Sequence, residues 1–260
     1  MCFPYDAHPP IAPIQGAAID SGHLTLDSAD GSKFAAFAAR PDQPARAGIV
    51  VLPDVRGLFK FYEELALRFA EQGISAVAID YFGRTAGLGT RDESFPFMDH
   101  VAQTKPPQIS DDTGAAVRYL RSEQGGGCGS VFTVGFCFGG AQSWLQAANG
   151  HGLAGVIGFY GRPGAGRDGA PGPAQRAKEF ACPVLALMGG ADQGIPQEQV
   201  DELDAALTAA GVEHEVVVYP GAPHSFFDRS YEEHAEASAD AWQRMLSFIH
   251  QHSSAGAAAR

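Results

Sequence analysis

Continuous apolar runs recur along the chain and predict the strands of a sheet. Residues 48–52 and 74–79 are such runs, as expected for strands that are covered on both faces. Between them, Phe61, Leu65 and Phe69 repeat every four residues, which predicts a helix with one buried face. A strand, a helix and a strand at this spacing form a βαβ unit, so we expect the two strands to be parallel.

The rest of the chain continues this alternation. Asp30-Gly31 is a tight-turn signal between two strand-like segments, which predicts an antiparallel hairpin at a sheet edge. The predicted fold class is therefore α/β, a mostly parallel twisted sheet with helices on both faces. Further strands are predicted at 131–134, 153–160, 183–188 and 215–219, and further helices at 110–123, at 196–210 and around Trp242, Met245, Leu246 and Ile249.

We predict a single domain over residues 1–260, a length that can bury a sizeable core. Residues 1–16 form a proline-rich, irregular leader in this prediction, and residues 254–260 form a frayed tail. Residues 81–108 interrupt the alternation with a long loop-like connection, which in a compact domain is often functional. This segment is a candidate lid over a site, and a plain surface excursion is the alternative.

Composition excludes several classes of protein. Hydrophobic residues make up 45% of the chain and charged residues 18%, as expected of a globular protein. The net charge of -12 argues against nucleic acid or an anionic membrane surface as a partner. The N-terminus lacks the basic and apolar regions of a secretory signal, and no apolar run reaches membrane-spanning length. We therefore expect a cytoplasmic protein.

The cysteines give no sign of a metal site or a disulfide framework. Cys2, Cys128, Cys137 and Cys182 match no zinc-binding spacing, and a chain of this size does not depend on disulfides. Cys137 differs from the other three in its surroundings, because it follows a predicted strand and is flanked by glycines two residues away on either side.

Gly135-Phe-Cys137-Phe-Gly139 is the G-x-S-x-G nucleophile elbow with cysteine in place of serine. The nucleophile of an elbow sits on a sharp, strained turn, so its neighbours must lack side chains that would clash. The turn also brings the thiol near a helix N-terminus, where unpaired N–H groups and the helix dipole favour a thiolate. The alternative is a glycine-rich connection with an ordinary buried cysteine.

An acid and a histidine follow the elbow in the order that this fold requires. Asp192 comes after the next strand but one, and His224 comes after the last strand, behind a Pro-Gly-Ala-Pro turn. The carboxyl ends of parallel strands meet at one edge of the sheet, so Cys137, Asp192 and His224 should lie together there. In such a triad the histidine acts as the base near neutral pH and the acid holds its tautomer. A turn aspartate and a loop histidine are the alternatives.

At this point the chain resembles the dienelactone hydrolase family of α/β-hydrolases over nearly its whole length. The resemblance rests on four motifs. They are Gly135-Phe-Cys137-Phe-Gly-Gly140, Met188-Gly-Gly-Ala-Asp192, Gly221-Ala-Pro-His224-Ser-Phe226 and Asp80-Tyr-Phe-Gly-Arg84. It implies an α/β-hydrolase fold and a cysteine hydrolase that opens a lactone or an enol ester without a cofactor or a metal. It also implies a small-molecule substrate that bears a carboxylate, and a monomer or a homodimer.

The resemblance assigns further site residues. The family has a glutamate after the first parallel strand that contacts the thiol and helps to deprotonate it, and the matching residue here is Asp54, one methylene shorter. The family also holds the substrate carboxylate with two arginines, matched here by Arg84 and, with a spacing one residue longer, by Arg229. Tyr160 is a further candidate for substrate contact. A loop cap for Asp54 and solvated surface positions for the arginines are the alternatives.

The oxyanion hole of an elbow enzyme consists of backbone N–H groups. One belongs to the residue after the nucleophile, here Phe138, and the other to the loop after the first parallel strand, here Val55.

Three functions remain open from the sequence. The first is a lactonase or enol-ester hydrolase that works through a thiolate acyl-enzyme. The second is a general carboxylesterase or thioesterase with the same triad, since fold and triad do not separate acyl substrates. The third is a hydrolase that has lost its activity and binds a metabolite or senses redox state through Cys137.

Overall fold

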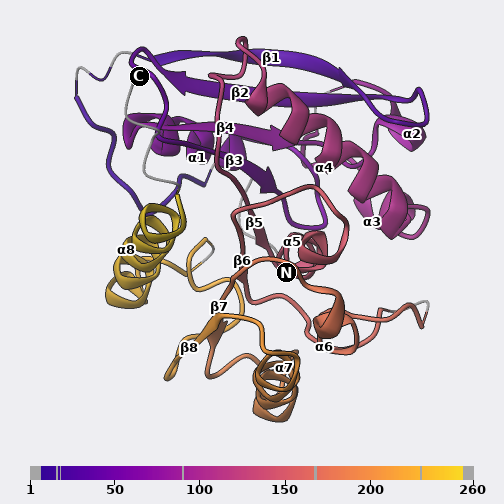
Figure 1. Cartoon of the computed structure of the whole chain (residues 1–260), viewed down its shortest axis with the longest axis vertical. Coiled ribbons are helices and arrows are strands. Elements are labelled where there is room, and N and C mark those ends of the chain that lie inside the picture. The colour runs from indigo at the N-terminus through magenta and orange to yellow at the C-terminus, as the bar shows by residue number, and fades with distance from the viewer. Residues whose placement is uncertain are drawn as a thin grey trace.

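The computed structural model describes residues 7–15, 17, 19–89, 91–166, 169–228 and 230–253. Within them, eight strands form one sheet in the order β1-β2-β4-β3-β5-β6-β7-β8 (Figure 1). The strands are β1 (Ile19–Asp27), β2 (Lys33–Pro41), β3 (Ala47–Leu52), β4 (Ile74–Ile79), β5 (Val131–Phe136), β6 (Gly155–Phe159), β7 (Val184–Gly189) and β8 (His214–Tyr219).

The sheet is parallel from β4 through β3 to β8, and only the hairpin of β1 and β2 runs antiparallel to its neighbours. All residues of β3, β4, β5 and β7 are buried, which explains why their sequences are apolar without alternation. The predicted fold class, a mostly parallel sheet with an antiparallel hairpin at one edge, is confirmed.

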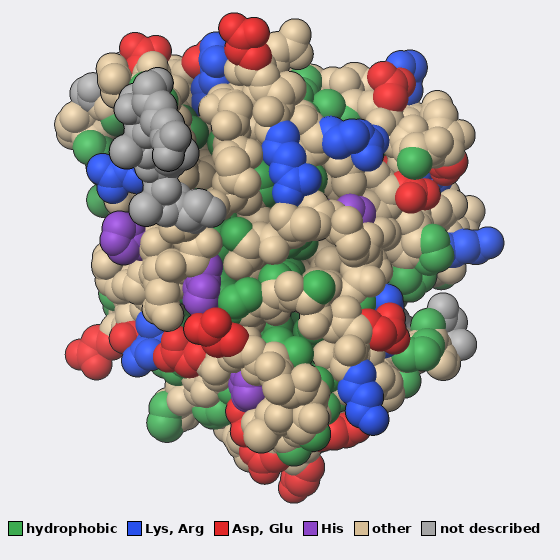
Figure 2. Space-filling model, in the orientation of Figure 1, with side chains coloured by type: hydrophobic (Ala, Val, Ile, Leu, Met, Phe, Trp, Pro, Cys, Tyr) green, Lys and Arg blue, Asp and Glu red, His purple; other side chains and the backbone are tan. Residues whose placement is uncertain are grey.

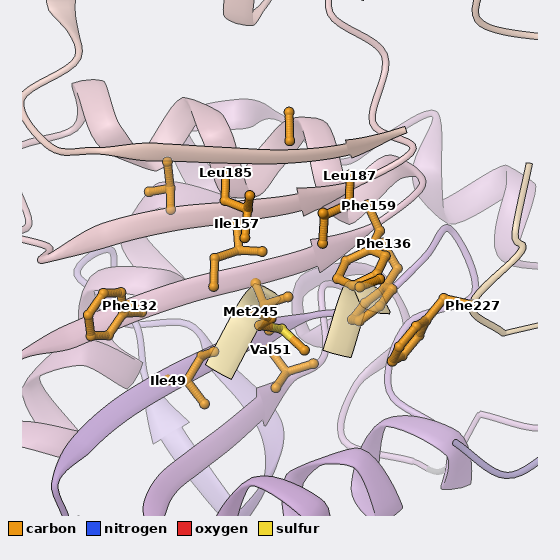
Figure 3. Packing of buried hydrophobic residues seen from close by; sticks show 14 of the residues in the cluster. Ile49, Val51, Phe132, Phe136, Ile157, Phe159, Leu185, Leu187, Phe227 and Met245 are labelled. Carbon is orange, nitrogen blue, oxygen red and sulfur yellow. The ribbon is translucent and has the colours of Figure 1, made fainter. Parts of the chain in front are cut away.

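Helices cover both faces of the sheet (Figure 1). The odd-numbered residues of β3 and the even-numbered residues of β4 belong to the core on the side of α1 and α8. Their alternate residues belong to the core on the side of α4. Figure 3 shows the first of these cores, where Ile49 and Val51 lie near Met245 of α8. The helices are α1 (Lys60–Glu71), α2 (Gly83–Ala86), α3 (Phe97–Val101), α4 (Pro106–Arg121), α5 (Phe138–Leu145), α6 (Pro173–Arg176), α7 (Gln197–Ala210) and α8 (Ala235–His252), with 3₁₀ turns at Gln146–Ala148 and Ala177–Glu179.

Helix α5 packs closely on the sheet through Trp144. This side chain is fully buried, and a Cβ atom at position 158 would overlap its indole ring, so only glycine fits on β6 at that point. The indole Nε1–H donates a hydrogen bond of 3.1 Å to the carbonyl oxygen of Leu185 on β7. The helix that starts next to Cys137 is therefore held on two neighbouring strands.

The long connection at 81–108 contains two short helices, α2 and α3, and is tied to the end of β4. Arg91 lies in this segment, is buried, and donates a hydrogen bond of 2.8 Å to Asp80. Its guanidinium also lies 4.7 Å from the ring centroid of Phe95. Whether the segment moves as a lid stays a prediction.

The surface carries the acidic excess of the composition. On the face shown in Figure 2, acidic side chains gather at the lower edge, where α7 exposes Glu198, Asp201, Glu202 and Asp204. Among the helices that the structure describes, none combines the length and the apolarity needed to cross a bilayer.

Candidate active site

Cys137 lies at the sharp turn between β5 and α5, as the elbow motif predicts. Its backbone has φ 56° and ψ -113°, a conformation that residues other than glycine rarely adopt. The turn is held by a hydrogen bond of 3.0 Å from the Cys137 N–H to the Phe159 carbonyl, and by one of 3.0 Å from the Gly140 N–H to the Cys137 carbonyl. The surrounding backbone thus maintains Cys137 in a strained conformation, and strain of this kind is concentrated at functional sites.

The two glycines of the motif are required by close backbone contacts. A Cβ atom on Gly135 would overlap the carbonyl oxygen of Gly139, and one on Gly139 would overlap the carbonyl oxygens of Leu52 and Pro53. The steric reason that the sequence suggested for these glycines is therefore confirmed. The same contacts bring the loop after β3 against the start of α5.

The register of the sheet places the acid and the histidine beside this turn. Leu52 pairs with Gly135, Phe159 with Leu187, and Gly189 with Tyr219, so the carboxyl ends of β3, β5, β7 and β8 are aligned. The loops that follow these strands carry the predicted site residues.

Asp192 and His224 form a close pair. The Asp192 side chain is almost fully buried, and its Oδ1 accepts a hydrogen bond of 2.8 Å from the Gly194 N–H. Its Oδ2 lies 2.6 Å from Nδ1 of His224. The carboxylate therefore fixes a proton on Nδ1, and the hydrogen bond between His224 and the Cys137 thiol falls to the other ring nitrogen, Nε2.

These contacts change the acidity of His224. Burial lowers the pKa of the imidazole, but the hydrogen bonds and charges of Asp192 and Cys137 raise it more, to about 10. A histidine with such a pKa carries a proton at neutral pH. The Cys137 thiol therefore lies beside an imidazolium at neutral pH.

The other thiols differ from Cys137 in exposure. Cys128 and Cys182 are buried, and burial raises the pKa of both, that of Cys182 to about 12. Cys137 is partly exposed. Cys2 lies outside the described residues.

Of the two predicted oxyanion-hole donors, Phe138 directly follows Cys137 in the chain, and Val55 belongs to the loop after β3, which packs against the start of α5. Phe138 is the first residue of α5, so its N–H has no partner within the helix. In the part of the chain that the structure describes, neither the Phe138 N–H nor the Val55 N–H donates to another protein group. Both are available to a developing negative charge, and their role stays a prediction.

Asp54 does not contact the thiol in the structure. Its carboxylate is buried and accepts hydrogen bonds from Arg56, namely 2.8 Å from the backbone N–H, 3.2 Å from Nε and 2.8 Å from Nη2. The family resemblance implies a contact between Asp54 and the thiol. Arg56, two residues further on, holds the carboxylate instead.

Arg84 is engaged by carboxylates of the protein itself. Its Nη1 and Nη2 donate to Asp112 at 2.7 and 2.8 Å, its Nε donates to Asp30 at 2.8 Å, and Nη2 also donates to Ser28 at 2.7 Å. A guanidinium has five N–H donors in a fixed fork, and these contacts use four of them. Arg84 thus ties α2 to the β1–β2 turn and to α4, which argues against a substrate clamp. Arg229, the second predicted arginine, lies outside the described residues.

Tyr160 lies at the site but is not exposed to a substrate. Its side chain is fully buried, and its hydroxyl donates a hydrogen bond of 2.7 Å to Asp228. Its ring centroid lies 5.0 Å from that of His224. The predicted role in substrate contact is therefore replaced by packing against the histidine, with Asp228 as a partner that the sequence reasoning missed. The position of Asp228, four residues after His224, was the available signal.

Within the described residues, no group of three or more histidine, cysteine or acidic side chains is arranged to hold a metal ion.

Comparisons with family models, with curated proteins and with solved structures all indicate the same family. The model of the dienelactone hydrolase family matches residues 34–253. The protein named "Putative carboxymethylenebutenolidase" from Yersinia pestis is 31% identical over 247 residues, which are 92% of this chain and 91% of that protein. The protein of the same name from Escherichia coli strain K12 is 30% identical over 243 residues, 90% of this chain and 88% of that protein. A crystal structure titled as that of a "Putative Dienelactone Hydrolase" from Klebsiella pneumoniae is similar with a TM-score of 0.80 and 28% identity, over 90% of this chain and 99% of that one.

Proposed function

The chain belongs to the dienelactone hydrolase family and is a hydrolase of carboxylic esters or lactones, and on this premise we propose that it opens a lactone or enol ester through a thioester on Cys137. The relatives named as carboxymethylenebutenolidases support an unsaturated lactone as the substrate class. No cofactor enters the proposed reaction.

One observation carries the proposal. Cys137 has the strained elbow conformation and shares a hydrogen bond with His224, whose Nδ1 lies 2.6 Å from Asp192. A nucleophile, a base and a group that orients the base are the three parts of covalent acyl transfer.

Acylation begins when the Cys137 thiolate attacks the substrate carbonyl carbon. The carbonyl oxygen takes the negative charge, and the N–H groups of Val55 and Phe138 stabilise it. When the tetrahedral intermediate collapses, the C–O bond of the ester breaks. The leaving enolate or alkoxide takes the proton from Nε2 of His224, and in a lactone it stays attached to the acyl group.

Deacylation uses the same residues in the opposite sense. His224, now neutral, accepts a proton from a water molecule that attacks the thioester carbonyl. The carbon–sulfur bond breaks, Cys137 leaves as a thiolate, and the product is a carboxylic acid. The Asp192 carboxylate stabilises the imidazolium each time that it forms.

The test replaces the nucleophile. The variant Cys137→Ala should lose hydrolysis of an unsaturated lactone and of chromogenic esters, while its thermal melt stays close to that of the wild type. Iodoacetamide should label Cys137 faster than Cys128 or Cys182, because burial raises the pKa of both other thiols. Peptide mass mapping over time measures these rates.

The matched control is Cys182→Ala, which removes a thiol away from the predicted site. This variant should keep the wild-type kcat/KM, provided that a cooperative thermal melt shows that it is folded. Full activity of Cys137→Ala would contradict the proposal, as would equal labelling of the three thiols.

A general carboxylesterase or thioesterase is the second candidate, and one observation favours it. Arg84 is occupied by Asp30 and Asp112, so one of the two arginines for a substrate carboxylate is engaged elsewhere. An enzyme without that clamp would hydrolyse neutral and anionic acyl substrates at similar rates.

A further inference from the structure

The loop that carries Val55 is hydrogen-bonded at both ends to the two residues that follow β4, Asp80 and Tyr81. The hydroxyl of Tyr81 donates a hydrogen bond of 2.8 Å to the carbonyl oxygen of Pro53. The carboxylate of Asp80 accepts a hydrogen bond of 3.1 Å from the Leu58 N–H. Val55 lies between these two attachments, so its N–H direction depends on them.

Tyr81 also contacts the other predicted donor segment. Its ring packs edge to face against the ring of Phe138, with centroids 5.4 Å apart and an interplanar angle of 87°. Phe138 is the first residue of α5. One side chain therefore contacts both of the segments whose backbone N–H groups would bind the oxyanion.

We propose that Tyr81 is a positioning residue that sets the geometry of the oxyanion hole, through its hydroxyl on the Val55 loop and its ring on Phe138. This inference rests on the proposed function, because it assumes that the reaction passes through a tetrahedral oxyanion at Cys137. Tyr81 itself does not touch the substrate.

The surroundings keep this hydroxyl in its role as a donor. Tyr81 is 3% exposed, and burial raises its pKa well above the ordinary value, with the charges of Asp54, Asp80 and Cys137 adding to the effect. The phenol therefore stays protonated over the working pH range. Its single proton points to the Pro53 carbonyl.

Asp80, the partner attachment, is itself braced by the 81–108 segment. Its Oδ2 accepts hydrogen bonds of 3.0 Å from the Phe82 N–H and 2.8 Å from Nη2 of Arg91. Gly57 lies so close that a Cβ atom there would overlap the Asp80 carboxylate, and its φ of 81° also suits glycine. The loop that carries Val55 thus packs closely against Asp80, and the 81–108 segment holds Asp80 in place through Arg91.

The effect of losing such a support can be estimated from general catalysis. Loss of one oxyanion donor costs about 10²–10³-fold in kcat, and a misplacement of about 1 Å costs about 100-fold. Removal of the Tyr81 hydroxyl loosens one donor without deleting it. A fall in kcat of about 10- to 100-fold is therefore expected.

The experiment compares Tyr81→Phe with Tyr119→Phe, a control at the far end of α4. For Tyr81→Phe we expect the fall in kcat with KM changed by less than about twofold, since the hole acts on the transition state. Alkylation of Cys137 by iodoacetamide should keep its rate, because that displacement forms no oxyanion. A substrate-like aldehyde, which adds to Cys137 as a tetrahedral hemithioacetal, should bind more weakly by a similar factor.

The variant Phe138→Leu provides a second test, because it removes the ring contact and leaves the backbone N–H. It should lower kcat in the same manner and leave the alkylation rate unchanged. Wild-type kcat in Tyr81→Phe would overturn the inference, and so would a parallel fall of kcat and alkylation rate, which indicates a general structural role. If Cys137→Ala stays active, the proposed function fails instead, which keeps the two failures distinguishable.

Discussion

The pair of Asp54 and Arg56 allows a quantitative prediction, because both side chains are nearly inaccessible. Their exposed fractions are 4% and 3%, and Nη2 of Arg56 lies 2.8 Å from Oδ2 of Asp54. The variant Arg56→Met keeps an unbranched, apolar side-chain stem and removes the guanidinium and its charge. The Asp54 carboxylate then retains the backbone N–H of residue 56 and loses the guanidinium donors.

Breaking a buried ion pair from one side costs about 3–5 kcal/mol, because a buried charge loses its partner. For a domain of this size each kcal/mol lowers Tm by about 2–4 °C, so we expect a loss of roughly 6–20 °C. The double variant Asp54→Asn/Arg56→Met removes both charges and should recover more than half of that loss. Denaturant unfolding with an unchanged m-value, combined with thermal melts, measures all four corners of the cycle.

The reasoning would be refuted if the effects of the two single variants simply added in the double variant. The double variant Asp54→Asn/Arg56→Met also tests how the Cys137 thiol is activated. If His224 alone keeps Cys137 ionised, the double variant alkylates at the wild-type rate once it is folded. A fall of tenfold or more would give Asp54 the thiol-activating role that the family resemblance implies.

Two further predictions concern charge. In Asp192→Asn, His224 loses the carboxylate that helps to raise its pKa to about 10. The alkaline limb of the pH profile of kcat/KM should therefore move to lower pH, which a pH–rate series measures. An unchanged alkaline limb would contradict the role of Asp192. In Arg84→Ala, the buried Asp112 loses its ion pair, so Tm should fall. The values of kcat/KM for an acidic lactone and for its methyl ester should change by the same small factor. A selective loss for the acidic lactone would instead support Arg84 as a ligand of the substrate carboxylate.

The pH dependence of stability follows from the same histidine. A group whose pKa is raised on folding contributes stability that is complete below its unfolded value of about 6.5. For His224 this contribution is lost as the pH rises through about 10. The pairing with Asp192 and Cys137 therefore supports the fold across the neutral range.

The sheet, and the meeting of Asp192 and His224 at its edge, could be predicted from the sequence because apolar runs and strand order indicate them. The apolar runs at 48–52 and 74–79 have one reasonable structure, a strand covered on both faces. The helix expected at 110–123 starts earlier, at Pro106, because proline is well suited to the first turn of a helix. The order of Cys137, Asp192 and His224 follows from strand order alone.

The partners of long charged side chains could not be predicted in this way. Arg84 and Asp112 are 28 residues apart, and their contact depends on how α2 and α4 pack, which no local pattern reports. Arg56 is only two residues from Asp54, so its capture of the carboxylate could have been weighed from the sequence. Tyr81 belongs to the Asp80–Arg84 motif, but its contact with the Pro53 carbonyl joins segments 28 residues apart, which the motif does not indicate.

The packing of α5 has a spectroscopic consequence. The chain has two tryptophans. Trp144 lies on α5 and is fully buried, and its indole N–H donates a hydrogen bond to the Leu185 carbonyl. The second, Trp242, packs on Phe69 at the other face of the sheet, with ring centroids 5.1 Å apart. In a Trp242→Phe variant, the wavelength of maximum fluorescence emission of Trp144 would therefore report whether α5 remains packed on β6 and β7. Far-ultraviolet circular dichroism would follow the secondary structure of the rest of the molecule.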